Sequence, residues 1–511
     1  MKQTSVNLPN PGWTLNLLLV FALGCGALLR YTDLSAPLLD FHPTRQLFGA
    51  IKARGIYYQS LPEAPAWQKD LAVRLYSVEA TIEPPLMEQF SAAMYKYFGV
   101  QTAIPRAASA TFWMLGGIFL YRLAKNLSGT SFPAAAALAF YLLTPYSITA
   151  SRAFQPDPLM MLLLLIFWWS FEIWGRQLSW KWALVAGVSG GLAIFVKFTA
   201  AFFVSGAALG VIFAYTGVKK SIKNLQTWVI VLLGVLPPGI YLIYGTFIAG
   251  FLDQQFAGRF YPDMWINPVF YLRWLLKLNN VVHPFWLALA IVGWLLSDRK
   301  PVKIFLGTLW ATYFLYGMIS THHISTHDYY SLFAIPLAAL CLAQLFARIA
   351  RPSEQGPAWA HSIWVGCVEK IRSSRSLQII GWSVLLSSIL LFSIGQYTWR
   401  LKNDFRSQAA FWEQVGDAIG HQPGVLALTT DYGYPLAYYG WQKSSLWPLS
   451  ENIKDFEHTF SELTANKAYF LITDFEEYER QPELQNRLTK KYPILKQGQG
   501  FIMFDLLHPK L

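Results

Sequence analysis

The sequence has little charge and little cysteine. Only 14% of its 511 residues are charged, against about 25% in an ordinary soluble domain. Its three cysteines form neither a disulfide framework nor a cluster with the spacing of metal ligands. These shortages argue against a disulfide-stabilised secreted domain and against a cysteine zinc site.

What the chain has instead is long hydrophobic blocks. Apolar residues make up 54% of it, in blocks near the length that crosses about 30 Å of hydrocarbon. We expect a polytopic α-helical membrane protein with about 11 transmembrane helices. The first block lacks a basic leader and a cleavage site, so it is typical of a retained signal anchor. The expected spans are Thr14–Leu29, Ala107–Leu120, Phe132–Ala150, Pro158–Trp174, Trp182–Val196, Phe198–Thr216, Trp228–Ala249, Phe285–Leu296, Ile304–Ile319, Tyr330–Phe346 and Leu377–Ile394.

The formal net charge of +12 has a distribution that indicates orientation. Lys and Arg are scattered through short loops and are not gathered on one soluble module, so we expect no nucleic-acid partner. If the N-terminus is cytoplasmic, the loops rich in Lys and Arg fall inside, as in an inner-membrane protein. Splitting the apolar stretch 182–216 at Lys197 keeps Lys219 and Lys220 on that side.

Two external regions are too long to be simple connectors. The first, residues 31–104, contains the expected helices Thr44–Tyr58 and Pro84–Phe98, which we predict to lie along the membrane surface as amphipathic juxtamembrane helices. The second, residues 396–511, has a soluble composition and follows the transmembrane domain of residues 1–395. There we expect helices at Phe405–Ile419 and Phe475–Leu488 and strands at Val425–Thr429 and Ala468–Thr473, hence a small C-terminal α/β domain.

Ionisable residues gather at the external ends of the spans, where burial near lipid is costly. Each has an ordinary structural explanation, because Asp and Glu cap helices and Lys snorkels. Together they indicate one external polar cavity. They are Asp40, Glu83, Arg152, Asp157, Lys197, His322, His323 and His327.

The chemistry of these residues suits transfer to a hydroxyl group. Asp40 is a candidate general base, while His42 and Arg45 are candidates to bind phosphate. The three histidines could be metal ligands, but no second ligand set is visible, so hydrogen bonds to phosphate or sugar are favoured over a metal. We predict no metal residues and leave a divalent metal open as a cofactor.

Several short segments, in this order, resemble the GT-C superfamily of membrane glycosyltransferases. Specifically, the chain resembles the dolichyl-phosphate-mannose protein mannosyltransferase and aminoarabinose transferase-like family, over roughly residues 14–346. The segments are His42-Pro43-Thr44-Arg45-Gln46, Glu83-Pro84-Pro85-Leu86, Arg106, Arg152-Ala153-Phe154-Gln155-Pro156-Asp157 and His327-Asp328-Tyr329-Tyr330.

This resemblance implies a GT-C-like bundle that takes a hexose or pentose from a polyprenyl-phosphate-linked donor. The acceptor would be a lipid, glycan or protein on the external membrane face, the sugar carbon would be inverted, and membrane lipids would surround the bundle. Asp40 and Asp157 would be catalytic. The implied substrate-binding residues are His42, Arg45, Gln46, Glu83, Arg152, Gln155, Lys197, His322, His323, His327, Tyr329 and Tyr330.

The sequence also departs from the family pattern. Many members carry an adjacent acidic pair in the first loop, whereas here Asp40 is followed by Phe41 and His42. Some carry Lys before the Pro-Pro, where this chain has Glu83. The rival interpretations are a transporter or flippase of a lipid-linked sugar and an inactive membrane scaffold.

Overall fold

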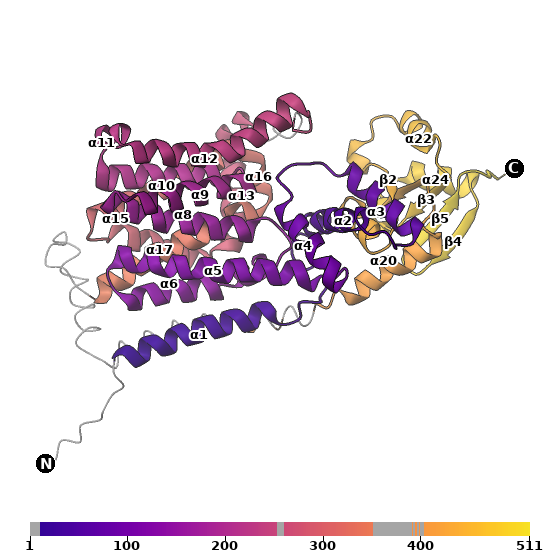
Figure 1. Ribbon diagram of the computed structural model, residues 1–511. Helices are drawn as coiled ribbons and strands as arrows, with labels where there is room; N and C mark the ends of the chain where they lie inside the picture. Colours follow the sequence, from indigo (N-terminus) through magenta and orange to yellow (C-terminus); the bar gives the residue numbers. More distant parts are fainter. Residues whose placement is uncertain are drawn as a thin grey trace, which may run out of the picture.

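The computed structural model describes residues 11–252, 260–350 and 403–510, together with residues 391, 394, 395 and 398. Figure 1 shows a bundle of helices and, at one end of it, a smaller part that contains both helices and strands. Helices of the first external loop, residues 31–104, lie between these two parts.

The bundle is built from helices of very different lengths. The short turns at the ends of its longer helices carry much of the site described below. Its elements are α1 (Pro11–Tyr31), α5 (Ala103–Ser128), α6 (Ser131–Leu143), α7 (Pro145–Ala150), α8 (Asp157–Gln177), α9 (Trp180–Val196), α10 (Ala200–Val211), η1 (Ile212–Thr216), α11 (Val218–Lys223), α12 (Leu225–Ile243), η2 (Tyr244–Ile248), η3 (Pro262–Ile266), α13 (Pro268–Val281), α14 (Pro284–Leu295), α15 (Lys300–Ile319), α16 (Thr321–Thr326), η4 (Asp328–Ser331) and α17 (Ala334–Ala350).

These helices confirm a polytopic membrane bundle. Five are long and apolar enough to cross a membrane, and α13 and α14, bent by 92°, make a sixth candidate span. Shorter apolar helices cover Leu15–Tyr31, Ser131–Leu143, Trp180–Val196 and Ala200–Thr216. The expected split at Lys197 is present, since α9 ends at Val196. The expected last span, Leu377–Ile394, lies almost entirely outside the described residues.

One expected span is divided. Pro145 has no backbone N–H to continue a helix, and the stretch expected as Phe132–Ala150 becomes α6 and α7, which meet at Thr144.

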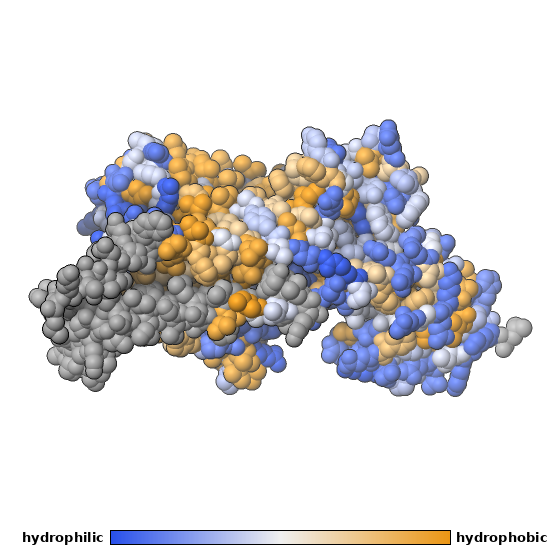
Figure 2. Space-filling view, turned by 90° about the horizontal axis from the view of Figure 1, so that it is seen from below, coloured by the Kyte–Doolittle hydropathy of each residue, from blue (hydrophilic) through white to orange (hydrophobic). Residues whose placement is uncertain are grey.

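The space-filling view in Figure 2 shows a largely hydrophobic surface on the bundle and a mostly hydrophilic one on the C-terminal part. Such a surface suits a bundle that faces lipid.

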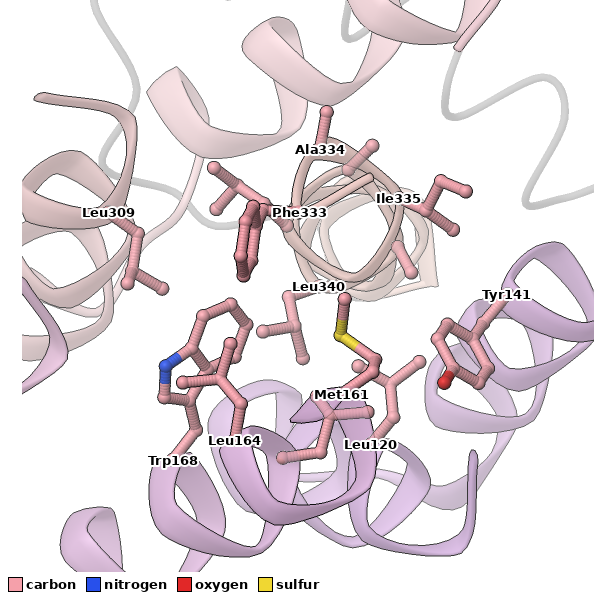
Figure 3. Close-up of a cluster of buried hydrophobic side chains, with 14 of the residues drawn as sticks. Leu120, Tyr141, Met161, Leu164, Trp168, Leu309, Phe333, Ala334, Ile335 and Leu340 are labelled. Atoms are coloured by element: carbon pink, nitrogen blue, oxygen red, sulfur yellow. The ribbon is translucent and has the colours of Figure 1, made fainter. Parts of the chain in front are cut away.

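The bundle core is formed where α8 faces α17 and α15. Figure 3 shows Trp168 of α8 beside Leu340 of α17, with Phe333 just before that helix. All three side chains are buried. Elsewhere the helices approach very closely: a Cβ atom at Gly191 of α9 would lie 2.1 Å from the carbonyl oxygen of Leu233 on α12, so only glycine fits there.

The first external loop forms α2 (Pro43–Gln59), α3 (Ala66–Val78) and α4 (Leu86–Phe98). The position of α2 corrects the expectation of a surface helix, because every residue from Gln46 to Gly55 is buried. Neighbouring α3, α4 and α21 (Tyr434–Tyr438) cover it. By contrast, α4 exposes Phe90, Tyr97 and Phe98, as an interfacial helix would. Helix α3 has no counterpart among the helices expected from the sequence.

The C-terminal part is a mixed α/β unit with a five-stranded sheet of order β2-β1-β3-β5-β4. β1 pairs in parallel with β2 and β3, and β5 runs antiparallel to β3 and β4. The helix expected at Phe475–Leu488 is interrupted, since α24 restarts at Pro482. The elements are α20 (Arg406–Ile419), β1 (Val425–Leu428), η5 (Asp431–Gly433), α21, β2 (Ser444–Leu446), η6 (Ser450–Asn452), α22 (Phe456–Thr464), β3 (Tyr469–Ile472), α23 (Phe475–Glu479), α24 (Pro482–Lys491), β4 (Ile494–Gly498) and β5 (Phe501–Asp505).

The C-terminal part docks on the middle of α2. Arg54 donates from Nη1 to the Tyr438 carbonyl at 2.6 Å and from Nη2 to the Ala437 carbonyl at 3.0 Å. The Leu38 backbone N–H donates to the Tyr439 hydroxyl at 2.8 Å. These contacts, which we call the α2–α21 junction, tie the C-terminal unit to the helix whose first turn reaches the candidate site.

Candidate active site

A pocket of about 220 Å³ lies where the first external loop meets the ends of several bundle helices. It brings together the start of α2, the residues before α4, the turn between α9 and α10, and the segment from α16 to η4. Its lining residues are Arg45, Ile82, Glu83, Lys197, Phe198, Thr199, Leu252, His323, His327, Tyr329 and Tyr330. Seven of the residues expected from the sequence are in this list: Arg45, Glu83, Lys197, His323, His327, Tyr329 and Tyr330.

Arg45 lies in the first turn of α2 and is held by a carboxylate. Its Nη2 donates to Glu83 Oε2 at 2.5 Å. Burial alone would lower the pKa of Arg45, but the neighbouring Glu83 carboxylate outweighs it and raises that pKa. Pro84 and Pro85 follow Glu83 and leave this residue outside α4. The pair therefore presents a fixed, fully charged guanidinium to the pocket.

Lys197 is the second cation of the pocket, and it too has its own carboxylate. Its Nζ lies 2.9 Å from each oxygen of Asp157, and both side chains are almost fully buried. Asp157 is the first residue of α8, where the helix dipole favours a negative charge. The Lys197 ammonium also lies 5.1 Å and 5.6 Å from the ring centroids of Tyr329 and Tyr330. Asp157 thus fixes Lys197 and does not itself line the pocket.

The histidine segment is only partly in the pocket. His323 and His327 line it, with ring centroids 6.1 Å apart. His322 is not among the lining residues and has its ring 6.0 Å from that of Tyr261. Burial, followed by the positive neighbours His42, His322 and Lys277, lowers the pKa of His327. A neutral imidazole there provides one donor and one acceptor.

Asp40 lies outside the pocket, in a buried ion pair. Arg106 Nη1 is 3.0 Å from Oδ2, and Nη2 is 2.8 Å from Oδ1. The two side chains are 6% and 0% exposed, respectively. Gln46 Nε2 donates to Asp40 Oδ1 at 3.2 Å and to the Phe41 carbonyl at 2.6 Å. Asp40 and Gln46 therefore hold the turn that leads into α2.

Two further residues expected to bind substrate are committed to the protein interior. Arg152 is fully buried and donates to the backbone carbonyls of Thr32 and Asp33 at 2.9 Å and 2.7 Å. Gln155 is also buried, and its Nε2 lacks a hydrogen-bond partner among the described residues. Neither residue lines the pocket. Arg152 instead anchors the start of the first external loop to the bundle.

His42 sits next to the pocket and has a partner that the list of expected site residues omits. Its Nε2 lies 2.8 Å from Asp328 Oδ1, and its ring packs edge-on against the pocket residue Tyr329 with centroids 4.8 Å apart. The Tyr146 hydroxyl donates to the same Asp328 oxygen at 2.7 Å. Asp328 stands inside the quoted His327-Asp328-Tyr329-Tyr330 segment, which could have revealed it, whereas nothing in the sequence distinguishes Tyr146.

The described residues include no group of three or more His, Cys, Asp or Glu side chains arranged to hold a metal ion. The pocket chemistry that can be described is therefore that of two paired cations, two histidines and two tyrosines at the end of a membrane bundle.

Comparison with known proteins identifies the fold. The family model described as dolichyl-phosphate-mannose-protein mannosyltransferase matches residues 82–241, a range that includes Glu83, Asp157 and Lys197. No curated protein gives a significant match. Together with the solved structures below, the match confirms the expected resemblance to GT-C membrane glycosyltransferases.

Three solved structures are similar to this chain over almost its whole length. The apo form of ArnT from Cupriavidus metallidurans aligns with a TM-score of 0.58 at 15% identity, over 96% of this chain and 97% of that one. The same protein bound to undecaprenyl phosphate gives 0.56 at 14%, over 97% and 98%. The Archaeoglobus fulgidus oligosaccharyltransferase in complex with Zn and sulfate gives 0.54 at 12%, over 96% and 73%. At these identities the likeness shows a shared fold.

Proposed function

We propose that this chain is a glycosyltransferase that moves a hexose or pentose from a polyprenyl-phosphate carrier to a lipid, glycan or protein acceptor. The observation that carries the proposal is the pair of cations, Arg45 and Lys197, at one pocket where the bundle ends. The similar ArnT was solved with undecaprenyl phosphate, and an oligosaccharyltransferase of the same fold with a dolichol-phosphate. A lipid phosphate is therefore the ligand to test first.

The two cations suit a leaving phosphate. When the bond between the anomeric carbon and the phosphate oxygen breaks, negative charge grows on that oxygen, and fixed donors stabilise it. Among the described residues only Nη2 of Arg45 makes a hydrogen bond, so other guanidinium N–H groups remain for phosphate. Lys197 has three N–H groups, two of which suffice for Asp157. Each carboxylate holds its cation in place before the ligand arrives.

The remaining pocket residues suit a sugar. Tyr329, Tyr330, His323 and His327 combine aromatic faces with hydrogen-bonding groups. Because burial keeps the pKa of His327 low, its neutral ring can both donate to and accept from sugar hydroxyls. We assign His322 no direct contact with the sugar.

The reaction we propose is a single displacement with inversion at the anomeric carbon, which requires one base for the acceptor hydroxyl. Asp40 is the base that the sequence nominates. Its two oxygens already accept from Arg106, so we assign it a positioning role, as we do Asp157 through Lys197. We also propose that the site faces the exterior of an inner membrane, with a cytoplasmic N-terminus and residues 396–511 as the external domain.

The test is transfer of radiolabelled sugar from a panel of polyprenyl-phosphate sugars in membranes that contain the full chain. Wild type should move label to an acceptor, whereas Lys197→Gln should lose about 100-fold in rate. The matched control is Lys181→Gln, at the exposed start of α9, the helix that ends just before Lys197; this variant should behave as wild type. NMR of the product should show the inverted anomer.

Two results would overturn the proposal. Failure of wild type to transfer label from every donor, while it carries a lipid-linked sugar across the bilayer, would establish the flippase alternative. Failure of both transfer and transport would leave the scaffold alternative.

A further inference from the structure

His42 and Asp328 form a pair that the phosphate-binding roles above do not use. They come from segments far apart in the chain, the turn before α2 and the start of η4. Their side chains are 28% and 18% exposed, more open than those of Asp40 and Arg106. His42 also has a left-handed backbone with φ of 44°, a costly conformation that a structure retains where a side chain must be aimed.

The partners of Asp328 fix which nitrogen of His42 carries the proton. A carboxylate only accepts, so Nε2 of His42 must donate to Oδ1 at 2.8 Å. Tyr146 donates to the same oxygen at 2.7 Å, and Asn280 lies 3.5 Å from Oδ2. With Nε2 protonated, a neutral imidazole has its lone pair on Nδ1, which makes no hydrogen bond to the described residues.

The His42 ring is not among the lining residues of the pocket, but it lies against one of them. Tyr329 packs against the His42 ring and also lines the pocket, 5.1 Å from Lys197 Nζ. The titratable groups around His42 are Asp328, Tyr146, Tyr329 and, at longer range, His327. Among the described groups that contact His42, Asp328 is the one carboxylate.

We propose that His42, oriented by Asp328, is the general base for the acceptor hydroxyl, in place of Asp40. This rests on the proposed function. Nδ1 takes the hydroxyl proton while the acceptor oxygen forms its bond to the anomeric carbon. The bond from that carbon to the phosphate oxygen breaks, and its electron pair leaves on the lipid phosphate beside Arg45 and Lys197. The imidazolium then loses its proton to water.

The first experiment compares pH profiles of kcat in purified full-length protein. Wild type should lose activity at low pH as a histidine becomes protonated. His42→Gln keeps an amide near Asp328 but has no basic nitrogen, so its kcat should fall by about 100-fold or more and the acid limb should disappear. Asp40→Asn should keep the acid limb whatever its loss of stability. The control is the exposed His458→Gln, which should match wild type.

A second measurement separates chemistry from folding. Added imidazole should restore part of the activity of His42→Ala, and binding of polyprenyl phosphate should stay within about twofold of wild type. Asp328→Asn should lose about tenfold or more alone but little when added to His42→Gln, because the two act as one unit.

Three outcomes would overturn the assignment. One is near-normal kcat in His42→Gln, another is loss of the acid limb in Asp40→Asn, and the third is absence of imidazole rescue in a His42→Ala protein that still binds polyprenyl phosphate. If wild type itself transfers no sugar, the proposed function is wrong, and so is the assignment of His42 as general base. If wild type transfers and His42→Gln does too, only the base is wrong.

Discussion

The first turn and the middle of α2 place the same residue type in opposite settings. Arg45, in the first turn, meets a carboxylate and keeps N–H groups directed to a pocket. Arg54, in the α2–α21 junction, meets two carbonyl groups and stands 3.7 Å from the Trp441 ring centroid. Burial lowers the pKa of Arg54 to about 10, whereas Glu83 raises that of Arg45. The partner of each arginine therefore determines whether it serves the pocket or the α2–α21 junction.

The largest expected effect comes from a substitution at the pocket, in the first turn of α2. Arg45→Gln removes the guanidinium beside the leaving phosphate, so kcat/KM for a polyprenyl-phosphate sugar should fall by about 100-fold to 1000-fold. The thermal unfolding midpoint should change little, because Arg45 is partly exposed and paired at a pocket. Arg74→Gln on α3, whose arginine pairs with Asp70 at the surface, is the control. Equal losses in both variants would contradict a special role for Arg45.

The pocket residues that the sequence predicts lie at the ends of spans. Lys197, placed between two apolar blocks, and the segment His327-Asp328-Tyr329-Tyr330 both reach the site as expected from their position at one membrane face. An ionisable residue that stands next to apolar blocks is recognised from its immediate neighbours. A single sequence is therefore enough to predict that it lies near lipid.

The contacts of two candidate residues, Asp40 and His42, depend on partners that are distant in the chain. Asp40 looked available as a base, since nothing near it in the chain shows that Arg106 occupies both its oxygens. His42 looked like a phosphate ligand because its partner Asp328 lies 286 residues away. Likewise, Thr44–Tyr58 reads as a surface helix until α3, α4 and α21 cover it. Pairing between remote segments is set by tertiary packing, which a local pattern does not encode.

The next effect should be on stability and not on chemistry. Arg54→Ala removes the donor from the Tyr438 and Ala437 carbonyl groups and the stacking on Trp441. The loss should lower the free energy of unfolding by about 3 kcal/mol. Thermal unfolding in detergent measures this, with Arg74→Ala as the control. Protein that remains folded should bind polyprenyl phosphate normally. Weaker lipid binding with an unchanged midpoint would show that the first turn and the middle of α2 do not divide these tasks.

The smallest effect concerns a carboxylate that joins the same two parts of the molecule. Glu79, which caps α3, accepts from the Tyr434 hydroxyl at 2.9 Å. Burial is the largest influence on it and raises its pKa, more than Tyr434 and Lys52 lower it. The folded state therefore binds the Glu79 proton more tightly than the unfolded state does, so its contribution is favourable below the unfolded pKa and is lost as pH rises through the folded one.

Glu79→Gln keeps an acceptor for Tyr434 but has no charge to bury. At neutral pH the variant should unfold about 1–2 °C higher than wild type, and the gap should shrink as pH falls and Glu79 takes up its proton. Unfolding midpoints measured across pH 4 to 8 test this, with the exposed Glu462→Gln as the control. A gap that widens toward acid pH would mean that Glu79 is stabilised as the anion, by Lys52 and Tyr434, and that the junction is held by charge as the pocket is.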